Sequence, residues 1–400
     1  MRILRTGLRW LAQAWLILGL SLLLLLVVDR GLRVLLPEPA GAARIDPAAR
    51  APERLSAAAV AEHPWISDYW DEHEAARHTR WQSYVYWRRQ PFAGALIRVD
   101  AHGFRHTPQA GAAPPDAPAV WVFGGSAVWG TAARDQGTLP AQLAQLWAER
   151  HPGRALRWLN FGESGYVSQQ SALAFQLALR CGQRPALALF MDGANDVFAA
   201  LQNGHAGLPQ NESNRVREFN LSRRVPQLLG AWASRLEGIQ GLAQLGKPPA
   251  ALPPAAELGA AVAEAWWRQV HETQILARAE AVPTLHFWQP TVFERNPARA
   301  DETAVIASSL IQHRDLQLAA TARVRQLLAQ DGDAARVDLS SVYDAAPQPL
   351  YFDFVHTSET GQRLLAAAML PAIETALAQA QPASRPDPVC ADLPMPEAPP

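Results

Sequence analysis

Cysteines and metal-binding motifs are scarce in this 400-residue sequence. Its two cysteines, Cys181 and Cys390, are too few for the disulfide framework of a small secreted domain. In an oxidising compartment the two could pair; alternatively, Cys181 is an ordinary thiol at a helix end and Cys390 lies in a loose tail. The eleven histidines show no HExxH-type spacing, so we predict neither a metal nor a cofactor.

Charge is also sparse, and its two signs balance. Charged residues make up 18% of the chain, and 36 basic side chains against 37 acidic ones give a formal net charge of -1 at pH 7. Without a run of Lys or Arg, the sequence has no basic footprint for nucleic acid, which is not an expected partner. The 49% of hydrophobic residues is typical of a globular protein rather than a disordered one.

The stretch from Trp10 to Val28 is apolar and carries no charge. Its length matches a bilayer core, which about twenty helical residues span. Arg2, Arg5 and Arg9 precede it, which favours a cytoplasmic N-terminus. We therefore expect residues 1–35 to hold the cytoplasmic N-terminus and one transmembrane signal anchor. The protein would be a single-pass protein of the inner (cytoplasmic) membrane, facing the periplasm or exterior.

A cleaved signal peptide is the alternative for this segment. Small residues at cleavage-like spacing occur at Pro39–Ala43. However, the apolar run is longer than a typical signal-peptide core, and the candidate cleavage site lies well beyond it. An uncleaved anchor is therefore favoured.

Composition divides the rest of the chain into three parts. Residues 36–118 are predicted to be a Pro- and Ala-rich tether followed by a Trp-rich segment, which is either a separate module or a strap across the domain. Residues 119–382 form the predicted main domain, with an insertion at about 199–254. Residues 383–400 are predicted to be a disordered Pro-rich tail.

From Ala119 onward, apolar runs of strand length alternate with segments of helical period. The runs are "AVWVFG", "ALRWLNFG", "ALALFMDG", "PTLHFWQP" and "ARVDLSSV". Continuous apolar strands separated by amphipathic helices indicate a parallel sheet that is covered on both faces. The sequence therefore predicts an α/β fold of three layers, α/β/α, with a central, mostly parallel five-stranded sheet.

Polar residues gather where these runs end, at the edge where parallel sheets bind ligands. Ser126, Gly165, Asn195 and His356 are each weak signals alone, as a helix cap, a turn glycine, an Asx turn and a structural histidine. Together they suggest acyl transfer. A hydroxyl becomes a nucleophile when an imidazole takes its proton and a carboxylate, here Asp353, orients that imidazole. The Ser126 and Gly165 N–H groups and the Asn195 amide would stabilise the oxyanion.

In these blocks the chain resembles the SGNH (GDSL-type) hydrolases, as an extracytoplasmic, membrane-anchored member. The resemblance extends over roughly Ala119 to Ala380. It implies a flavodoxin-like fold, with Ser126 as nucleophile, Asp353 and His356 in Asp-x-x-His, and Gly165 and Asn195 in the oxyanion hole. The matching blocks are "VFGGSAVWG", "NFGESGYVSQQ", Gly-x-Asn-Asp and Asp-x-x-His. One position departs from the family pattern: Gly125 stands where an aspartate is common.

The expected function is that of a serine esterase removing O-acyl groups, such as acetyl, from a cell-envelope or exported glycan. An O-acyltransferase and a non-catalytic component of a polysaccharide-export assembly are the alternatives. The expected partners are an acylated small molecule or glycan and the membrane; the oligomeric state stays open.

Substrate contacts are the least specific expectation. Gln289, Trp129 and Tyr166 are expected to line the pocket, although an ordinary strand-end turn would explain Gln289 equally well. Aromatic side chains of the Trp-rich segment could form a surface for sugar rings or, alternatively, pack that segment onto the domain. These side chains are Trp65, Trp70, Tyr84 and Trp87.

Overall fold

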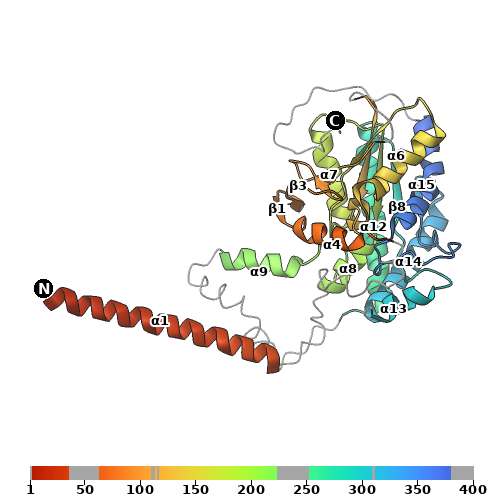
Figure 1. Ribbon diagram of the computed structural model, residues 1–400. Coiled ribbons are helices and arrows are strands. Elements are labelled where there is room, and N and C mark those ends of the chain that lie inside the picture. Colours follow the sequence, from red (N-terminus) through yellow and green to blue (C-terminus); the bar gives the residue numbers. More distant parts are fainter. Residues whose placement is uncertain are drawn as a thin grey trace. The chain divides into compact units, whose positions relative to one another are not determined.

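The computed structural model describes residues 2–35, 63–109, 113–114, 117–222, 252–308 and 311–379. The chain divides into two compact units, Met1–Ala49 with Glu212–Ala251, and Arg50–Asn211 with Leu252–Pro400. Within the described residues, the first unit contains helices α1 (Arg2–Leu35) and α9 (Glu212–Ser222) (Figure 1). The predicted tether up to residue 62, most of the insertion and the C-terminal tail lie outside the described residues.

Helix α1 includes a stretch, Trp10–Gly31, that is long and apolar enough to cross a membrane, with a mean hydropathy of 2.5. A signal sequence near an N-terminus meets the same criterion of length and composition. The predicted apolar helix is therefore present, and its function as an anchor stays a prediction.

The second unit is built on a five-stranded parallel sheet, as the sequence predicted. Its strands in spatial order are β6 (Arg157–Asn160), β5 (Ala119–Gly124), β7 (Leu187–Asp192), β8 (Thr284–Trp288) and β9 (Arg336–Asp338). The strand order reverses around β5, which places a topological switch point between the carboxyl ends of β5 and β7. Open parallel sheets bind ligands at such points.

Alternate residues of the central strands enter two different cores, because successive strand side chains point to opposite faces. Val120 and Val122 of β5 pack with helices α6 (Leu139–Arg150) and α15 (Glu359–Gln379). Trp121 and Phe123 pack on the opposite face with helix α7 (Ser168–Arg180) and the end of α12 (Ala255–Ala279). The sheet is thus covered on both faces, which confirms the predicted three layers (Figure 1).

Two element boundaries differ from the sequence expectation. Helix α8 (Ala194–Asn203) continues through Ala199, so the regular fold extends to Asn203 before the insertion begins. The helix expected over about 301–329 is two helices, α13 (Ala300–Ser308) and α14 (Ile311–Asp331). A third core joins α8, α12 and α14 through residues such as Val197, Trp266 and Leu316.

The Trp-rich segment lies in the same compact unit as the sheet. It contains helix α4 and two short antiparallel hairpins, and its apolar side chains pack against Trp129, Ala132 and Phe352. We call residues 63–107 the N-terminal strap. Its elements are α4 (Ile66–Ala75), β1 (Thr79–Gln82), β2 (Tyr86–Arg89), β3 (Phe92–Ala93) and β4 (Arg98–Val99).

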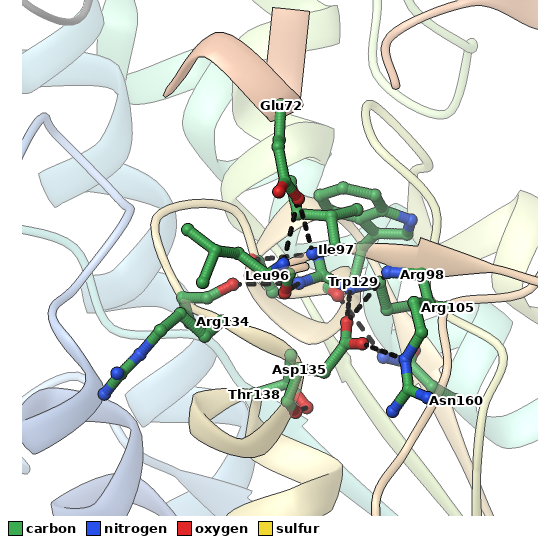
Figure 2. Close-up of polar contacts among 12 residues, drawn as sticks. Glu72, Leu96, Ile97, Arg98, Arg105, Trp129, Arg134, Asp135, Thr138 and Asn160 are labelled. Atoms are coloured by element: carbon green, nitrogen blue, oxygen red, sulfur yellow. Dashed lines mark hydrogen bonds and ion pairs between the residues drawn. The ribbon is translucent and has the colours of Figure 1, made fainter. Parts of the chain in front are cut away.

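Polar contacts attach the strap to the loop that follows the first strand of the sheet (Figure 2). Asp135 lies in the short helix η1 (Asp135–Gly137) and accepts hydrogen bonds from Arg105 Nε at 2.7 Å and Arg98 Nε at 3.1 Å. Within the strap, Glu72 accepts hydrogen bonds from the backbone N–H groups of Leu96 and Ile97. The strap is therefore part of the unit that holds the sheet rather than a separate module.

The aromatic residues of the Trp-rich segment differ in environment. Trp65, Trp70 and Trp87 are half-buried, which favours the packing alternative for them. Trp81 and Tyr84, on the β1–β2 hairpin, are 69% and 66% exposed. Cys181 is buried at the end of α7, and its Sγ donates to Leu177 O at 3.4 Å; Cys390 lies outside the described residues.

Candidate active site

Ser126 stands at the switch point, directly after β5. The strand ends at Gly124, and Ser126 begins the short helix α5 (Ser126–Trp129). A Cβ on Gly124 would lie 2.4 Å from Met191 O of the neighbouring strand, and the φ of +155° is one that L residues rarely adopt. This glycine therefore allows the sharp turn from strand to helix that brings the Ser126 hydroxyl to the carboxyl edge of the sheet.

His356 and Asp353 form a compact turn that faces this hydroxyl. Asp353 Oδ1 accepts hydrogen bonds from the backbone N–H groups of His356 at 2.7 Å and Val355 at 2.9 Å. Its other oxygen, Oδ2, lies 2.6 Å from His356 Nδ1, and His356 Nε2 lies 2.7 Å from Ser126 Oγ. Hydroxyl, imidazole and carboxylate thus form one continuous chain, the arrangement that activates a serine nucleophile.

The Asp353 carboxylate is held in its ionised form. Burial by itself would raise its pKa, but the charge of His356 and the hydrogen bonds from His356 and Val355 outweigh burial, and the net pKa is lowered. The His356 side chain is 15% exposed and thus largely enclosed by the surrounding protein.

The two further residues expected to stabilise an oxyanion meet beside the nucleophile. Asn195 is the second residue of α8. Its Nδ2 donates to the backbone carbonyl of Tyr166, the residue directly after Gly165, at 2.8 Å. A Cβ built on Gly125 would lie 2.2 Å from this Nδ2. The residue before Ser126 and the residue after Gly165 are therefore both adjacent to the Asn195 amide. Gly165 itself has φ +79°, in the region that favours glycine.

A buried pair of carboxyl groups supports the loop that carries Asn195. Asp196 accepts hydrogen bonds from Ser168 Oγ at 2.5 Å and Gly193 N at 3.2 Å, and Asp192 accepts one from Ser171 Oγ at 2.9 Å. Burial raises the pKa of Asp196 to about 6, against the opposing hydrogen bonds from Ser168. Burial and the neighbouring Asp196 raise the pKa of Asp192 well above its ordinary value.

The N-terminal strap reaches the loop around Gly165 through Arg89. This arginine forms a buried ion pair with Glu163, with side chains 4% and 0% exposed, and its Nη2 donates to Ser164 Oγ at 2.7 Å. Glu163 Oε2 also accepts the Arg89 backbone N–H at 2.9 Å. The strap thus fixes the two residues that precede Gly165.

Burial corrects the expected substrate contacts. Trp129 is fully buried, and the guanidinium carbons of Arg89 and Arg105 each lie 4.4 Å from its ring centroid. Tyr166 is 1% exposed and donates its hydroxyl to Trp87 O at 2.5 Å, and Gln289 is 4% exposed. All three side chains therefore lie in the interior rather than on an open pocket wall, because the strap covers Trp129 and Tyr166.

Arg89 and Gln210 are neighbours of the site that the sequence analysis did not identify. Gln210 Nε2 donates to Asn195 Oδ1 at 3.3 Å. Glu163 belongs to the motif "NFGESGYVSQQ", but its partner Arg89 lies 74 residues earlier, outside every motif. No local pattern pairs residues at such a separation.

The match to a known family fits this geometry. The model for the family "GDSL-like Lipase/Acylhydrolase" matches residues 120–369, more than half of the chain. The chain therefore belongs to the GDSL-like lipase/acylhydrolase family and is a hydrolase of ester bonds, which confirms the resemblance seen in the sequence. The match begins after the N-terminal strap.

No curated protein matches the sequence. Among solved structures, the chain is similar to LAE5, an α/β hydrolase from the metagenome of Lake Arreo, Spain, with 17% identity, covering 66% of this chain and 98% of that one, at a TM-score of 0.36. It is also similar to Axe2, an acetylxylan esterase from Geobacillus stearothermophilus (16% identity, 64% and 94% coverage, TM-score 0.36). A third similar structure is a carbohydrate acetylesterase family member from Sinorhizobium meliloti (14% identity, 65% and 99% coverage, TM-score 0.35). The family assignment rests on the family match.

Proposed function

We propose that the protein is a serine esterase that works through an acyl-enzyme. The observation that carries this proposal is the chain of hydrogen bonds from Ser126 Oγ through His356 to Asp353. His356 Nε2 takes the Ser126 proton as Oγ attacks the ester carbonyl, and then returns it to the leaving alcohol. A water, deprotonated by the same imidazole, releases the acid, while Asp353 stays ionised and holds the tautomer.

In this proposal, three hydrogen-bond donors stabilise the negative charge of the tetrahedral intermediate. They are the backbone N–H groups of Ser126 and Gly165 and the side-chain amide of Asn195. The contacts among residues 125, 166 and 195 support their convergence. A single good donor of this kind contributes roughly 3 to 4 kcal/mol of transition-state stabilisation.

The proposed substrate is an O-acyl group, such as acetyl, on a cell-envelope or exported glycan. Two features support this choice. The apolar helix α1 would anchor the chain in the inner membrane, with the catalytic unit outside the cytoplasm. The β1–β2 hairpin presents Trp81 and Tyr84 to solvent, and exposed aromatic rings are suited to contacts with sugar rings.

The shape of the hairpin tip adds to this support. Tyr84 and Tyr86 have φ of 69° and 75°, a conformation that bulky residues rarely adopt. Between them, Val85 is buried in the core, and its carbonyl accepts a hydrogen bond from Gln170 Nε2 at 2.8 Å. Anchoring Val85 therefore directs Tyr84 outward, and the strained backbone fits a functional surface.

The test is Ser126→Ala in the full chain, assayed with p-nitrophenyl acetate and with a fluorophosphonate probe. We expect loss of both turnover and labelling at an unchanged melting temperature, and Ser83→Ala, an exposed serine of the strap, to behave as wild type. Turnover that persists in Ser126→Ala would refute the mechanism. Product analysis with an acetylated glycan and an acceptor sugar distinguishes release of acetate from acyl transfer.

A further inference from the structure

The orientation of the Asn195 amide depends on residues outside the family motifs. Its Nδ2 donates to Tyr166 O at 2.8 Å, and its Oδ1 accepts from Gln210 Nε2 at 3.3 Å. An amide nitrogen carries two N–H donors, so the bond to Tyr166 leaves the second for a substrate oxygen. With the amide inverted, a carbonyl oxygen would face the developing negative charge instead. The acceptor at Tyr166 O and the donor at Gln210 therefore both favour the orientation in which Nδ2 faces the oxyanion.

Gln210 is held in place by its sequence neighbours. Asn203 Nδ2, at the end of α8, donates to Pro209 O at 2.9 Å, and the Asn211 N–H donates to Gln202 Oε1 at 3.1 Å. The residues on both sides of Gln210 are thus hydrogen-bonded back to the helix that carries Asn195. The Gln210 Oε1 lies 3.4 Å from the position a Cβ would take on Gly165. One side chain therefore lies beside both Gly165 and Asn195.

Gly125 provides the space that this orientation requires. Its φ of -83° is open to any residue, so backbone strain does not demand a glycine here. The demand comes from space, because a Cβ would lie 2.2 Å from Asn195 Nδ2 and 3.4 Å from Tyr166 O. The aspartate common at this position in the family would collide with the Asn195 amide as it lies here.

We propose that Gly125 and Gln210 act together as positioning residues for Asn195. Gly125 leaves the volume that the Nδ2 group occupies, and Gln210 holds the opposite end of the amide. Gly125, which departs from the family's Gly-Asp-Ser, and Gln210, near the start of the insertion, then both position the Asn195 amide. This inference deepens the proposed function and rests on Asn195 being an oxyanion donor.

The first test is Gln210→Glu in the full chain, measured by hydrolysis of p-nitrophenyl acetate. A carboxylate of the same size cannot donate to Asn195 Oδ1 and attracts Nδ2 instead. We expect kcat to fall roughly ten- to hundred-fold, approaching the loss of one oxyanion donor, with KM nearly unchanged. Gln326→Glu, the same change at an exposed position of α14, is the matched control and keeps wild-type kcat.

The second test is Gly125→Ala. Its new Cβ would displace the amide end of the Asn195 side chain rather than a backbone atom. We expect a comparable fall in kcat at a melting temperature close to wild type. Both substitutions are then repeated in the Asn195→Ala background, where neither should reduce kcat further, because each acts through Asn195. A purely structural effect would lower kcat by the same factor in both backgrounds.

The outcomes separate this inference from the proposed function. Wild-type kcat in both Gln210→Glu and Gly125→Ala, with Asn195→Ala impaired, overturns the inference alone. An inactive Ser126→Ala beside a fully active Asn195→Ala leaves the nucleophile in place and also overturns the inference. Full activity in Ser126→Ala overturns the mechanism itself.

Discussion

Two sets of buried carboxyl groups lie near the site, and they have different partners. Glu163 and Asp135 each form a buried ion pair with an arginine of the N-terminal strap, Arg89 and Arg105 respectively. Asp192 and Asp196 are bonded to serine hydroxyls, and each lies close to the other. The first set has its countercharge in contact, whereas burial without a countercharge raises the pKa of both members of the second set.

Two loops of the site are therefore held in place by different kinds of interaction. The loop leading to Gly165 is held by the ion pair of Glu163 with Arg89, which lies outside the family match. The loop leading to Asn195 is held by groups within the match, and its carboxyl pair changes charge with pH. Breaking an ion pair should therefore cost stability wherever its carboxyl group is ionised, including neutral pH, whereas altering the carboxyl pair should change how stability varies between acidic and neutral pH.

The largest effect is expected from Arg89→Met. Removing one partner leaves Glu163 buried without its countercharge, which costs about 3–5 kcal/mol in comparable pairs. We expect the free energy of unfolding, measured by chemical denaturation, to fall by that order. Catalytic turnover should also fall, because Glu163 and Ser164 lead to Gly165.

The matched control is Arg77→Met, which removes the exposed strap pair Arg77–Glu74, with side chains 51% and 60% exposed. Exposed pairs contribute less than about 1 kcal/mol. Equal losses from Arg89→Met and Arg77→Met would contradict the distinction between buried and exposed pairs.

A smaller, pH-dependent effect is expected from Asp196→Asn. The folded-state pKa of Asp196, about 6, lies above the ordinary value of 3.8, so the folded protein binds this proton more tightly. The resulting stability is fully present below pH 3.8 and is lost as the pH rises through about 6. Asparagine resembles the protonated acid, so the variant should lose less stability over this window, by about 1–3 kcal/mol.

Unfolding of wild type and Asp196→Asn at several pH values from 4 to 7 measures this difference. Parallel stability profiles for the two proteins would show that Asp196 does not hold the extra proton. The lowered pKa of Asp353 has the opposite effect, because it makes the folded state more stable as the pH rises. This contribution is the same in both proteins and cancels in the comparison.

The smallest effect on the fold is expected at the exposed tip of the strap. Trp81→Ala and Tyr84→Ala should change stability by less than about 0.5 kcal/mol, since both rings are largely exposed. We expect unchanged turnover of p-nitrophenyl acetate and a several-fold higher KM for an acetylated polysaccharide. Ile311→Ala, at a site 74% exposed on α14, is the control. A polysaccharide KM equal to wild type would rule out a role of the tip in glycan binding.

The sheet and the order of the motif blocks could be predicted from the sequence because their signals are local. Each strand is a short apolar run, and parallel strands bring their carboxyl ends to one edge, so Ser126 and Asn195 had to lie near one another. The Asp353–His356 contact could also be predicted, since the two residues lie three positions apart in one turn.

The surroundings of the site could not be predicted in this way. Trp129 and Tyr166 follow motif residues and looked available to a substrate, but the strap buries both. Their burial depends on Arg89, Arg105 and Trp87, whose positions are set by tertiary packing rather than by a sequence period. The bond from Gln210 to Asn195 likewise spans 15 residues without a recurring pattern.

The strap has a consequence for the smallest portion of this chain that can fold. Family resemblance begins at Val120, yet Tyr69 of helix α4 donates its hydroxyl to Gly130 O at 3.1 Å and accepts the Ala132 N–H at 2.9 Å. A chain shortened to the matched region would expose the indole of Trp129 and leave Glu163 and Asp135 without their arginines. The catalytic unit therefore includes helix α4, which begins more than 50 residues before the start of the family match.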